Sequence, residues 1–268
     1  MTAQLLDISP DEYHRRPELS STIAKTLNSK SPLHAKLERG KPPTKLMDRG
    51  SIMHRLLLGK GAYYEVCQFG DWRTKAAQAA RDDARARGLV PVLARDFEEY
   101  NIAAEAIRVQ LVERGIVLDG DSEIAATWQE PSEHGPVDCR CMFDHVWLDR
   151  GLILDFKITE DAAPNAVERT AENLGYAIQA AAYTRALTAL RPSLAGKIGF
   201  MFAFCEPDEP HAINLSTPDG VFMELVDRRW RRAVETWAKC TATDTWPSYG
   251  NTVNTLYPPA WALSKEIL

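Results

Sequence analysis

The chain has 268 residues, of which 45% are hydrophobic and 26% charged, so it can supply the core of one large domain or two small ones. This composition excludes an intrinsically disordered chain, a collagen-like repeat and a disulfide-stapled miniprotein. The 32 basic and 37 acidic residues give a net charge of −5, which is not the bulk charge of a typical nucleic-acid binder. Any nucleic-acid function therefore needs a local basic surface.

The sequence gives no sign of a membrane or secretory segment. It contains no run of about 20 apolar residues, and its first ten residues lack a basic region followed by an apolar core, so we expect a soluble, cytoplasmic protein. The five cysteines are scattered and form no C-x-x-C pair. This pattern favours reduced structural thiols over a cysteine-based zinc or iron–sulfur site.

Residues 1–120 are predicted to form a mainly helical lobe. Serine and proline capping signals recur in this part of the chain, together with apolar residues at helical spacing. They predict helices over residues 20–27, 31–40, 48–58, 73–87 and 96–114.

Around residue 121 the apolar pattern changes from helical spacing to the alternation that is typical of half-buried strands. The expected order is strands over 122–129, 137–148 and 152–158, a helix over 176–190, a strand over 197–205 and a helix over 219–239. Strands followed by a helix and a buried strand predict an α/β (α+β) fold, with a mixed central sheet flanked by helices. Residues 121–245 would form the sheet core and residues 246–268 a strap on the surface, within one domain over residues 1–268.

A hairpin in the sheet core carries the most informative polar residues. The turn sequence at residues 149–151 joins two strands, which would place Asp144 opposite or nearly opposite Asp155, with Lys157 on the same face as Asp155. Two buried carboxylates repel each other unless a cation lies between them, and Mg²⁺ or Mn²⁺ would provide one. The alternative is that both aspartates are ordinary strand-end residues and that Lys157 is a salt-bridge partner.

The apolar context of these charges favours the functional interpretation. Asp155 and Lys157 interrupt the otherwise apolar strand predicted over residues 152–158, and buried charges need a compensating partner. In metal-assisted phosphodiester hydrolysis, the cation would polarise the phosphate while Lys157 positioned the attacking water. Each of these residues would then have a chemical role.

With Asp144 as the first acidic residue and Asp155-Phe156-Lys157 as a D-x-K element, the sequence resembles the PD-(D/E)XK nuclease superfamily. Gln179 and Tyr183, four residues apart on the predicted helix, resemble the Gln-x-x-x-Tyr helix of one branch of this superfamily. The run over residues 50–54 is similar to the Gly-x-x-x-His helix of the same branch, in which the histidine is a metal ligand. Without that context, these three residues would be interpreted as structural.

The resemblance implies a restriction-endonuclease-like sheet and a role for each matched residue. Lys157 would serve the attacking water, while Gln179 and Tyr183 would orient the lysine or the scissile phosphate. Glu123 is a weaker catalytic candidate, since it matches an acidic residue of the family but equally fits a solvent-facing strand position. The site should work with either ion, and better with Mn²⁺, because imidazole accepts Mn²⁺ more readily than Mg²⁺. The expected metal ligands are His54, Asp144, Asp155 and the backbone carbonyl of Phe156.

Within this branch the chain resembles the RecE-like exonucleases, and further matching segments extend from residue 19 to residue 261. This resemblance implies a Mg²⁺- or Mn²⁺-dependent enzyme of phage or prophage origin that resects the 5′-ended strand of linear duplex DNA. It also implies a RecT-like single-strand annealing protein as partner and a ring-shaped homo-oligomer, with a tetramer favoured over a trimer. The alternatives are an endonuclease of the same superfamily, a catalytically silent scaffold that binds DNA ends and, more remotely, a non-nuclease metal hydrolase.

Several basic residues precede or follow the histidine motif and could contact DNA phosphates. The run Arg228–Arg232 is denser in charge, but on the predicted helix over 219–239 it favours a solvated face or a subunit contact over a DNA contact. The candidate DNA-binding residues are Lys41, Lys45, Arg49, Arg73 and Lys75.

Overall fold

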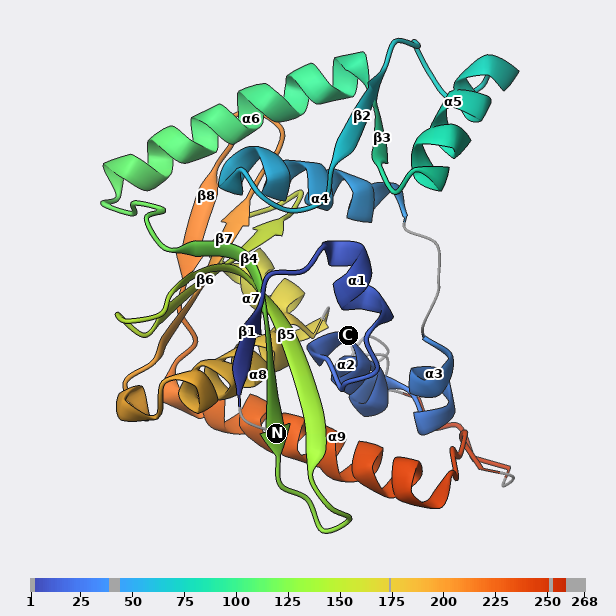
Figure 1. The fold of residues 1–268 in the computed structure, drawn as a ribbon, viewed down its shortest axis with the longest axis vertical. Coiled ribbons are helices and arrows are strands. Elements are labelled where there is room, and N and C mark those ends of the chain that lie inside the picture. Colours follow the sequence, from blue (N-terminus) through green and yellow to red (C-terminus); the bar gives the residue numbers. More distant parts are fainter. Residues whose placement is uncertain (1–2, 39–43, 174, 251–252, 259–268) are drawn as a thin grey trace, which may run out of the picture.

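The computed structural model describes residues 3–38, 44–173, 175–250 and 253–258. Its centre is a six-stranded mixed sheet in the order β1-β4-β5-β6-β7-β8, flanked by helices (Figure 1). The fold class predicted from the sequence is therefore confirmed, and the architecture matches a restriction-endonuclease-like fold.

The N-terminal part of the chain contains most of the predicted helices together with several short strands. The side chains of Ser20 and Ser31 cap two of these helices, as their positions in the sequence indicated. In chain order the elements are β1 (Gln4–Leu6), α1 (Pro10–Arg15), α2 (Ser21–Ser29), α3 (Pro32–Leu37), α4 (Lys45–Leu58), β2 (Tyr64–Cys67), α5 (Lys75–Ala86), β3 (Val90–Leu93) and α6 (Ala94–Glu113).

The second part of the chain supplies most of the central sheet. Strands β6 and β7 pair in parallel, whereas the other neighbouring pairs of the sheet are antiparallel. The elements are β4 (Asp121–Glu130), β5 (Val137–Trp147), β6 (Leu152–Ile158), α7 (Pro164–Asn173), α8 (Tyr176–Leu190), the 3-10 helix η1 (Pro192–Leu194), β7 (Gly199–Cys205), β8 (Ile213–Ser216) and α9 (Gly220–Thr243).

The lobe predicted to be mainly helical also contains strands that the sequence pattern did not reveal. β1 joins the central sheet beside β4, and β2 pairs with β3 in a separate parallel sheet. These strands have three or four residues each, which is too short for a clear alternation of polar and apolar side chains. The sequence pattern also did not predict α1, α7 and β8. Helix α1 and strand β8 are short, and α7 has few apolar residues.

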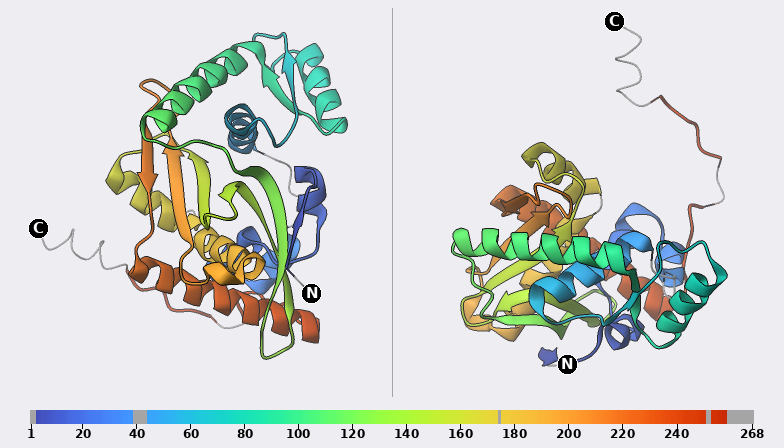
Figure 2. Two further views of the ribbon diagram at one scale, coloured as in Figure 1. Left: turned by 60° about the vertical axis from the view of Figure 1, so that its left-hand side comes forward. Right: turned by 90° about the horizontal axis from the view of Figure 1, so that it is seen from above.

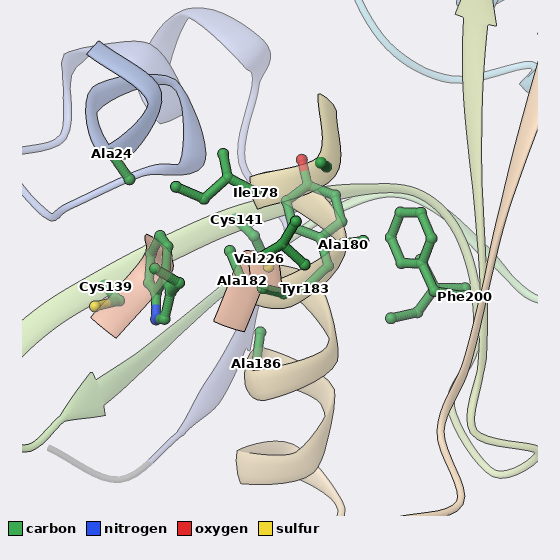
Figure 3. Close-up of a cluster of buried hydrophobic side chains, with 14 of the residues drawn as sticks. Ala24, Cys139, Cys141, Ile178, Ala180, Ala182, Tyr183, Ala186, Phe200 and Val226 are labelled. Atoms are coloured by element: carbon green, nitrogen blue, oxygen red, sulfur yellow. The ribbon is translucent and has the colours of Figure 1, made fainter. Parts of the chain in front are cut away.

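Two hydrophobic clusters lie on opposite faces of the sheet. Helices α4 and α6 pack against one face, through side chains that include Met53 and Ile107 (Figure 2). Helices α2, α8 and α9 pack against the other face, and the ring of Tyr183 projects from α8 into this cluster near Phe200 (Figure 3). The sheet is thus held between α4 on one side and α8 on the other, and both helices bear predicted site residues.

Among its described residues, the segment predicted to be a strap contacts the body through residues 246–249. The backbone N–H of Leu33 donates to the carbonyl of Pro247 at 3.1 Å, and the Trp246 ring contacts that of Trp237. Val253 is 101% exposed and Leu256 93% exposed, so these side chains face solvent, and the strap stays a prediction. Residues 251–252 and 259–268 of the predicted strap lie outside the described residues.

All five cysteines are buried free thiols, as the sequence predicted. Across the described ranges, no helix combines the length and the apolar character needed to cross a bilayer.

Candidate active site

Strands β5 and β6 diverge at the predicted acidic pair. Their pairing runs from Trp147 and Leu152 to His145 and Leu154 and stops one step before Asp144 and Asp155 would meet. The Asp144 carboxylate occupies this position, where its Oδ2 accepts a hydrogen bond from the Phe156 backbone N–H at 2.7 Å. The structure thus brings the two aspartates to adjacent strands, although they do not form a cross-strand pair.

His54 reaches the same place from helix α4. Its Nε2 lies 3.7 Å from Asp144 Oδ2 and 3.3 Å from the carbonyl oxygen of Phe156, and its Nδ1 lies 3.1 Å from Glu123 Oε1. One donor atom each from His54, Glu123 and Asp144 can be chosen so that all three lie within 4.8 Å of one another. Residues from α4, β4 and β5 therefore converge on one point.

Glu123 is more deeply involved than the sequence suggested. Its side chain is only 10% exposed and contacts His54, so the alternative of a solvent-facing strand residue is wrong. Its φ is +48°, a left-handed conformation that costs energy for a residue with a Cβ. A Cβ built on Gly61 would lie 3.3 Å from the Glu123 carboxyl carbon, so the loop after α4 packs directly against this side chain.

The charges in this group shift one another's proton affinity. Burial lowers the pKa of His54, but the charge of Asp144 and the hydrogen bond with Glu123 outweigh this effect and raise it to about 9. Burial raises the pKa of Asp144, against the opposing attraction of His54 and Lys157. In the metal-free protein at neutral pH, His54 is therefore a cation held by two carboxyl groups.

Asp155 and Lys157 form a buried ion pair next to the His54 group. Asp155 is fully buried, and its Oδ2 contacts Lys157 Nζ. Burial raises the pKa of Asp155 to about 7, although the nearby Lys157 charge opposes the shift. Burial also lowers the pKa of Lys157, but attraction to Asp155 and Asp144 leaves it above its ordinary value.

Helix α8 orients this ion pair. The Gln179 Nε2 group donates to Asp155 Oδ1 at 2.6 Å and to the Tyr183 hydroxyl oxygen at 2.9 Å. Tyr183 is itself buried, with its ring between Phe143 and Phe200. The two residues of the Gln-x-x-x-Tyr motif thus form a hydrogen-bonded chain that ends on the carboxylate of the D-x-K element.

The sequence patterns did not identify Tyr176, whose ring lies against the Lys157 ammonium group. Lys157 Nζ is 4.8 Å from the centre of the Tyr176 ring, a cation–π arrangement. Tyr176, Gln179 and Tyr183 are spaced i, i+3 and i+7, so they lie on one face of α8. Helical periodicity extended backwards from Gln179 could have identified this residue.

The donor atoms at this point suit a hard divalent cation. His54, Glu123 and Asp144 offer one nitrogen and two carboxylates, and the Phe156 carbonyl oxygen lies beside the imidazole. Oxygen ligands with a single imidazole fit Mg²⁺ or Mn²⁺. Asp155 contacts Lys157 and Gln179 here, and its predicted role as a ligand stays a prediction; Glu123 joins His54 and Asp144 among the residues that could hold a cation.

The described structure places three of the predicted DNA-binding residues, and their role stays a prediction. Arg49 is half-buried on α4 close to Tyr100, while Arg73 pairs with Asp71 and Lys75 begins the exposed end of α5. Lys41 lies outside the described residues, as does the side chain of Lys45.

The basic run Arg228–Arg232 on α9 contributes mainly to contacts within the chain. Arg229 forms a bidentate ion pair with Glu172 of α7, and Arg232 donates a hydrogen bond to the Asn28 side chain of α2. Arg228 and Arg231 pair with acidic residues one turn away on α9 itself. The contacts of Arg229 and Arg232 hold α9 against α7 and α2.

Comparison with known proteins agrees with this geometry. Residues 20–257 match the family described as a PDDEXK-like domain of unknown function (DUF3799). A candidate exonuclease from Eubacterium rectale has a similar fold, with a TM-score of 0.59, 12% sequence identity and coverage of 97% of this chain and 98% of its own. A phage-related exonuclease from Haemophilus somnus is less similar, with a TM-score of 0.38, 12% identity and coverage of 88% of this chain and 100% of its own.

No curated protein matches the chain. The family match nevertheless spans α2 to α9 and includes each residue of the site, from His54 to Tyr183. The predicted resemblance to the PD-(D/E)XK superfamily is confirmed, and the chain belongs to the PDDEXK-like family DUF3799.

Proposed function

We propose that the protein is a Mg²⁺- or Mn²⁺-dependent exodeoxyribonuclease that resects linear double-stranded DNA in the 5′-to-3′ direction and leaves 3′ single-stranded tails. One observation carries the proposal: His54, Glu123 and Asp144 converge beside the buried Asp155–Lys157 pair. Membership of a PDDEXK-like family supports phosphodiester hydrolysis. The description of the Eubacterium rectale relative as an exonuclease, together with the RecE-like sequence motifs, supports attack from a DNA end.

The residues divide into those that would hold the cation and those that act on the substrate. His54, Glu123, Asp144 and the Phe156 carbonyl would hold the ion. A divalent cation bound there neutralises phosphate charge and makes nearby water more acidic. Lys157, the remaining cation of the site, would place its ammonium group beside the attacking water and the phosphate.

The α8 residues keep Asp155 and Lys157 in position. Gln179 fixes one carboxylate oxygen of Asp155, which leaves the other oxygen for Lys157. Tyr183 fixes Gln179 in turn, and the Tyr176 ring limits the positions that the Lys157 ammonium group can take. A catalytic group held in this way loses little entropy when the substrate binds.

The proposed biological setting follows from the RecE-like resemblance alone. It comprises a cytoplasmic enzyme of phage or prophage origin, a ring-shaped homo-oligomer and a RecT-like annealing protein that loads on the 3′ tail. Such a ring can be basic inside and acidic outside, which would reconcile a net charge of −5 per chain with DNA binding.

The function is tested with linear duplex DNA labelled at either the 5′ or the 3′ end and incubated with Mg²⁺ or Mn²⁺. We expect early release of the 5′ label, no cutting of covalently closed circles and loss of activity in Lys157→Met. Lys197→Met is the matched control, because Lys197 is an exposed lysine just before β7. It should retain full activity.

Each alternative gives a different result in the same assay. Early release of the 3′ label would overturn the polarity, and cutting of closed circles would indicate an endonuclease. If the wild-type protein bound DNA ends but left both labels in place with either ion, the scaffold alternative would replace the proposal.

A further inference from the structure

Strands β4 and β5 pair on both sides of Glu123 but not at Glu123 itself. Ser122 pairs with His145, and two positions further along both strands Ile124 pairs with Phe143. No extra residue is inserted on either strand, so the interruption is not a β-bulge. It coincides with the φ of +48° at Glu123. The surrounding contacts must hold this left-handed conformation, because an unconstrained strand residue relaxes to extended backbone.

The imidazole of His145 bonds through both ring nitrogens to the segment just before Glu123. Its Nε2 accepts a hydrogen bond from the Gly120 backbone N–H at 3.3 Å, and its Nδ1 lies 2.7 Å from Ser122 Oγ. A neutral imidazole that accepts at Nε2 carries its hydrogen on Nδ1, so Nδ1 donates to the Ser122 hydroxyl. His145 is fully buried, so water does not compete for these bonds. One side chain of β5 thus fastens the start of β4 at two points.

Gly120 permits this arrangement because a residue with a side chain would not fit there. A Cβ at this position would lie 2.4 Å from the Val146 carbonyl oxygen and 3.0 Å from His145 Nε2. Strand β5 is held in turn on its other side, where Asp144 accepts a hydrogen bond from the Phe156 N–H of β6. The bonds of His145 therefore fasten the start of β4 to a strand that is itself fixed.

We propose that His145 is a positioning residue that holds Glu123 in its left-handed conformation and so directs the Glu123 carboxylate to the cation site. In this conformation Glu123 Oε1 lies 3.1 Å from His54 Nδ1. A change to extended backbone would rotate the chain about the N–Cα bond of Glu123 and carry the carboxylate away from this contact. The inference rests on the proposed function through its cation site.

The first test is the affinity of the DNA-free, full-length protein for Mn²⁺, measured by isothermal titration calorimetry. His145→Leu removes both ring nitrogens and should weaken Mn²⁺ binding about tenfold, as expected for a group that orients a metal ligand. Ser122→Ala removes one of the two bonds and should weaken binding less, whereas Ser122→Thr keeps the hydroxyl and should restore it. Gln129→Met is the control, because it removes a cross-strand bond to Asp138 at the other end of β4. It should leave the affinity unchanged.

A double-mutant comparison separates positioning from a general structural role. If His145 acts through Glu123, His145→Leu should have no further effect on Mn²⁺ affinity once Glu123→Ala has removed the carboxylate. A general structural role would weaken binding by the same factor in both backgrounds. That result, or wild-type Mn²⁺ affinity in His145→Leu, would overturn the inference.

The backbone conformation of residue 123 can be tested without metal, by thermal unfolding. Glycine adopts left-handed backbone more readily than alanine, so Glu123→Gly should melt at a higher temperature than Glu123→Ala. In an extended strand the order is reversed, because glycine weakens a strand interior. Adding Ser122→Ala or His145→Leu should therefore remove the advantage of glycine. An advantage that persists in both backgrounds would contradict the role of His145.

Failure of the inference and failure of the proposed function give different results. Wild-type protein that binds no Mn²⁺ would overturn the cation site and this inference together. Wild-type protein that binds Mn²⁺ with the predicted pattern of variants, but cleaves no end-labelled DNA, would overturn the proposed function and leave the role of His145 intact.

Discussion

Metal binding to the site should release a proton from His54. The side chain is held between Asp144 and Glu123, and these carboxyl groups raise its pKa to about 9 against the effect of burial. The same imidazole can ligate a cation only in its neutral form. A divalent ion must therefore displace the proton before His54 can become a ligand.

The size of the effect follows from the pKa of about 9. At pH 7 about 99% of His54 is protonated, so binding should release about one proton from this residue. The apparent affinity for Mn²⁺ should rise roughly tenfold per pH unit up to about pH 9 and then level off. Asp155, with a pKa of about 7, would add to the release only if the ion also engaged its carboxylate.

The proton count can be measured by isothermal titration calorimetry of Mn²⁺ into the DNA-free protein, in two buffers with different ionisation enthalpies. The difference in observed enthalpy gives the number of protons released. His54→Asn removes the titrating group and should reduce the release at pH 7 by about one proton. Wild-type binding without proton release at pH 7, or equal release by wild type and His54→Asn, would refute the assignment of His54 as a ligand that is protonated in the free protein.

Three other substitutions test separate parts of the structure. Tyr183→Phe removes the hydroxyl oxygen that accepts a hydrogen bond from Gln179. Losing this bond should raise the activation free energy by about 1 kcal/mol, which lowers kcat about fivefold with little change in KM. Steady-state cleavage of linear duplex DNA measures both constants. Arg185→Met leaves the buried carboxylate of Glu130 without its cation and should lower the free energy of unfolding by about 3 kcal/mol in urea denaturation. His54→Asp replaces a nitrogen ligand with oxygen, so the ratio of Mg²⁺-supported to Mn²⁺-supported activity should increase.

Controls for these substitutions come from the same chain. Arg231→Met breaks an ion pair whose arginine is largely exposed, and it should cost less than about 0.5 kcal/mol. Equal destabilisation by Arg185→Met and Arg231→Met would contradict the role assigned to burial. A raised KM with normal kcat in Tyr183→Phe would place its effect on substrate binding, and an unchanged metal preference in His54→Asp would remove His54 from the ligand set.

The sequence predicted the strands and helices that bear the site because their apolar patterns are long and regular. The hairpin over β5 and β6 and the helix α8 were expected within two residues of their observed bounds. Cross-strand opposition of Asp144 and Asp155 was not reached, because the Asp144 carboxylate takes the hydrogen bond that strand pairing would have used. Residue spacing does not indicate that a side chain will take the place of a backbone carbonyl as the hydrogen-bond acceptor.

Glu123 illustrates what spacing cannot reveal. The importance of Glu123 depends on a left-handed φ and on contact with His54, a residue 69 positions earlier in the chain. This contact is set by tertiary packing, whereas Tyr176 could have been found from helical periodicity alone.

The hydrogen bond from the Phe156 N–H to Asp144 bears on how relatives of this protein would lose activity. Because Asp144 satisfies a buried backbone group as well as serving the site, its loss would be selected against even in a chain that no longer cleaves DNA. The Lys157 ammonium group donates to no backbone group of the described residues, but its loss alone would leave the buried Asp155 carboxylate without its cation. Inactive descendants should therefore lose Lys157 and Asp155 together, and retention of Asp144 alone would be a poor indicator that a relative is still an enzyme.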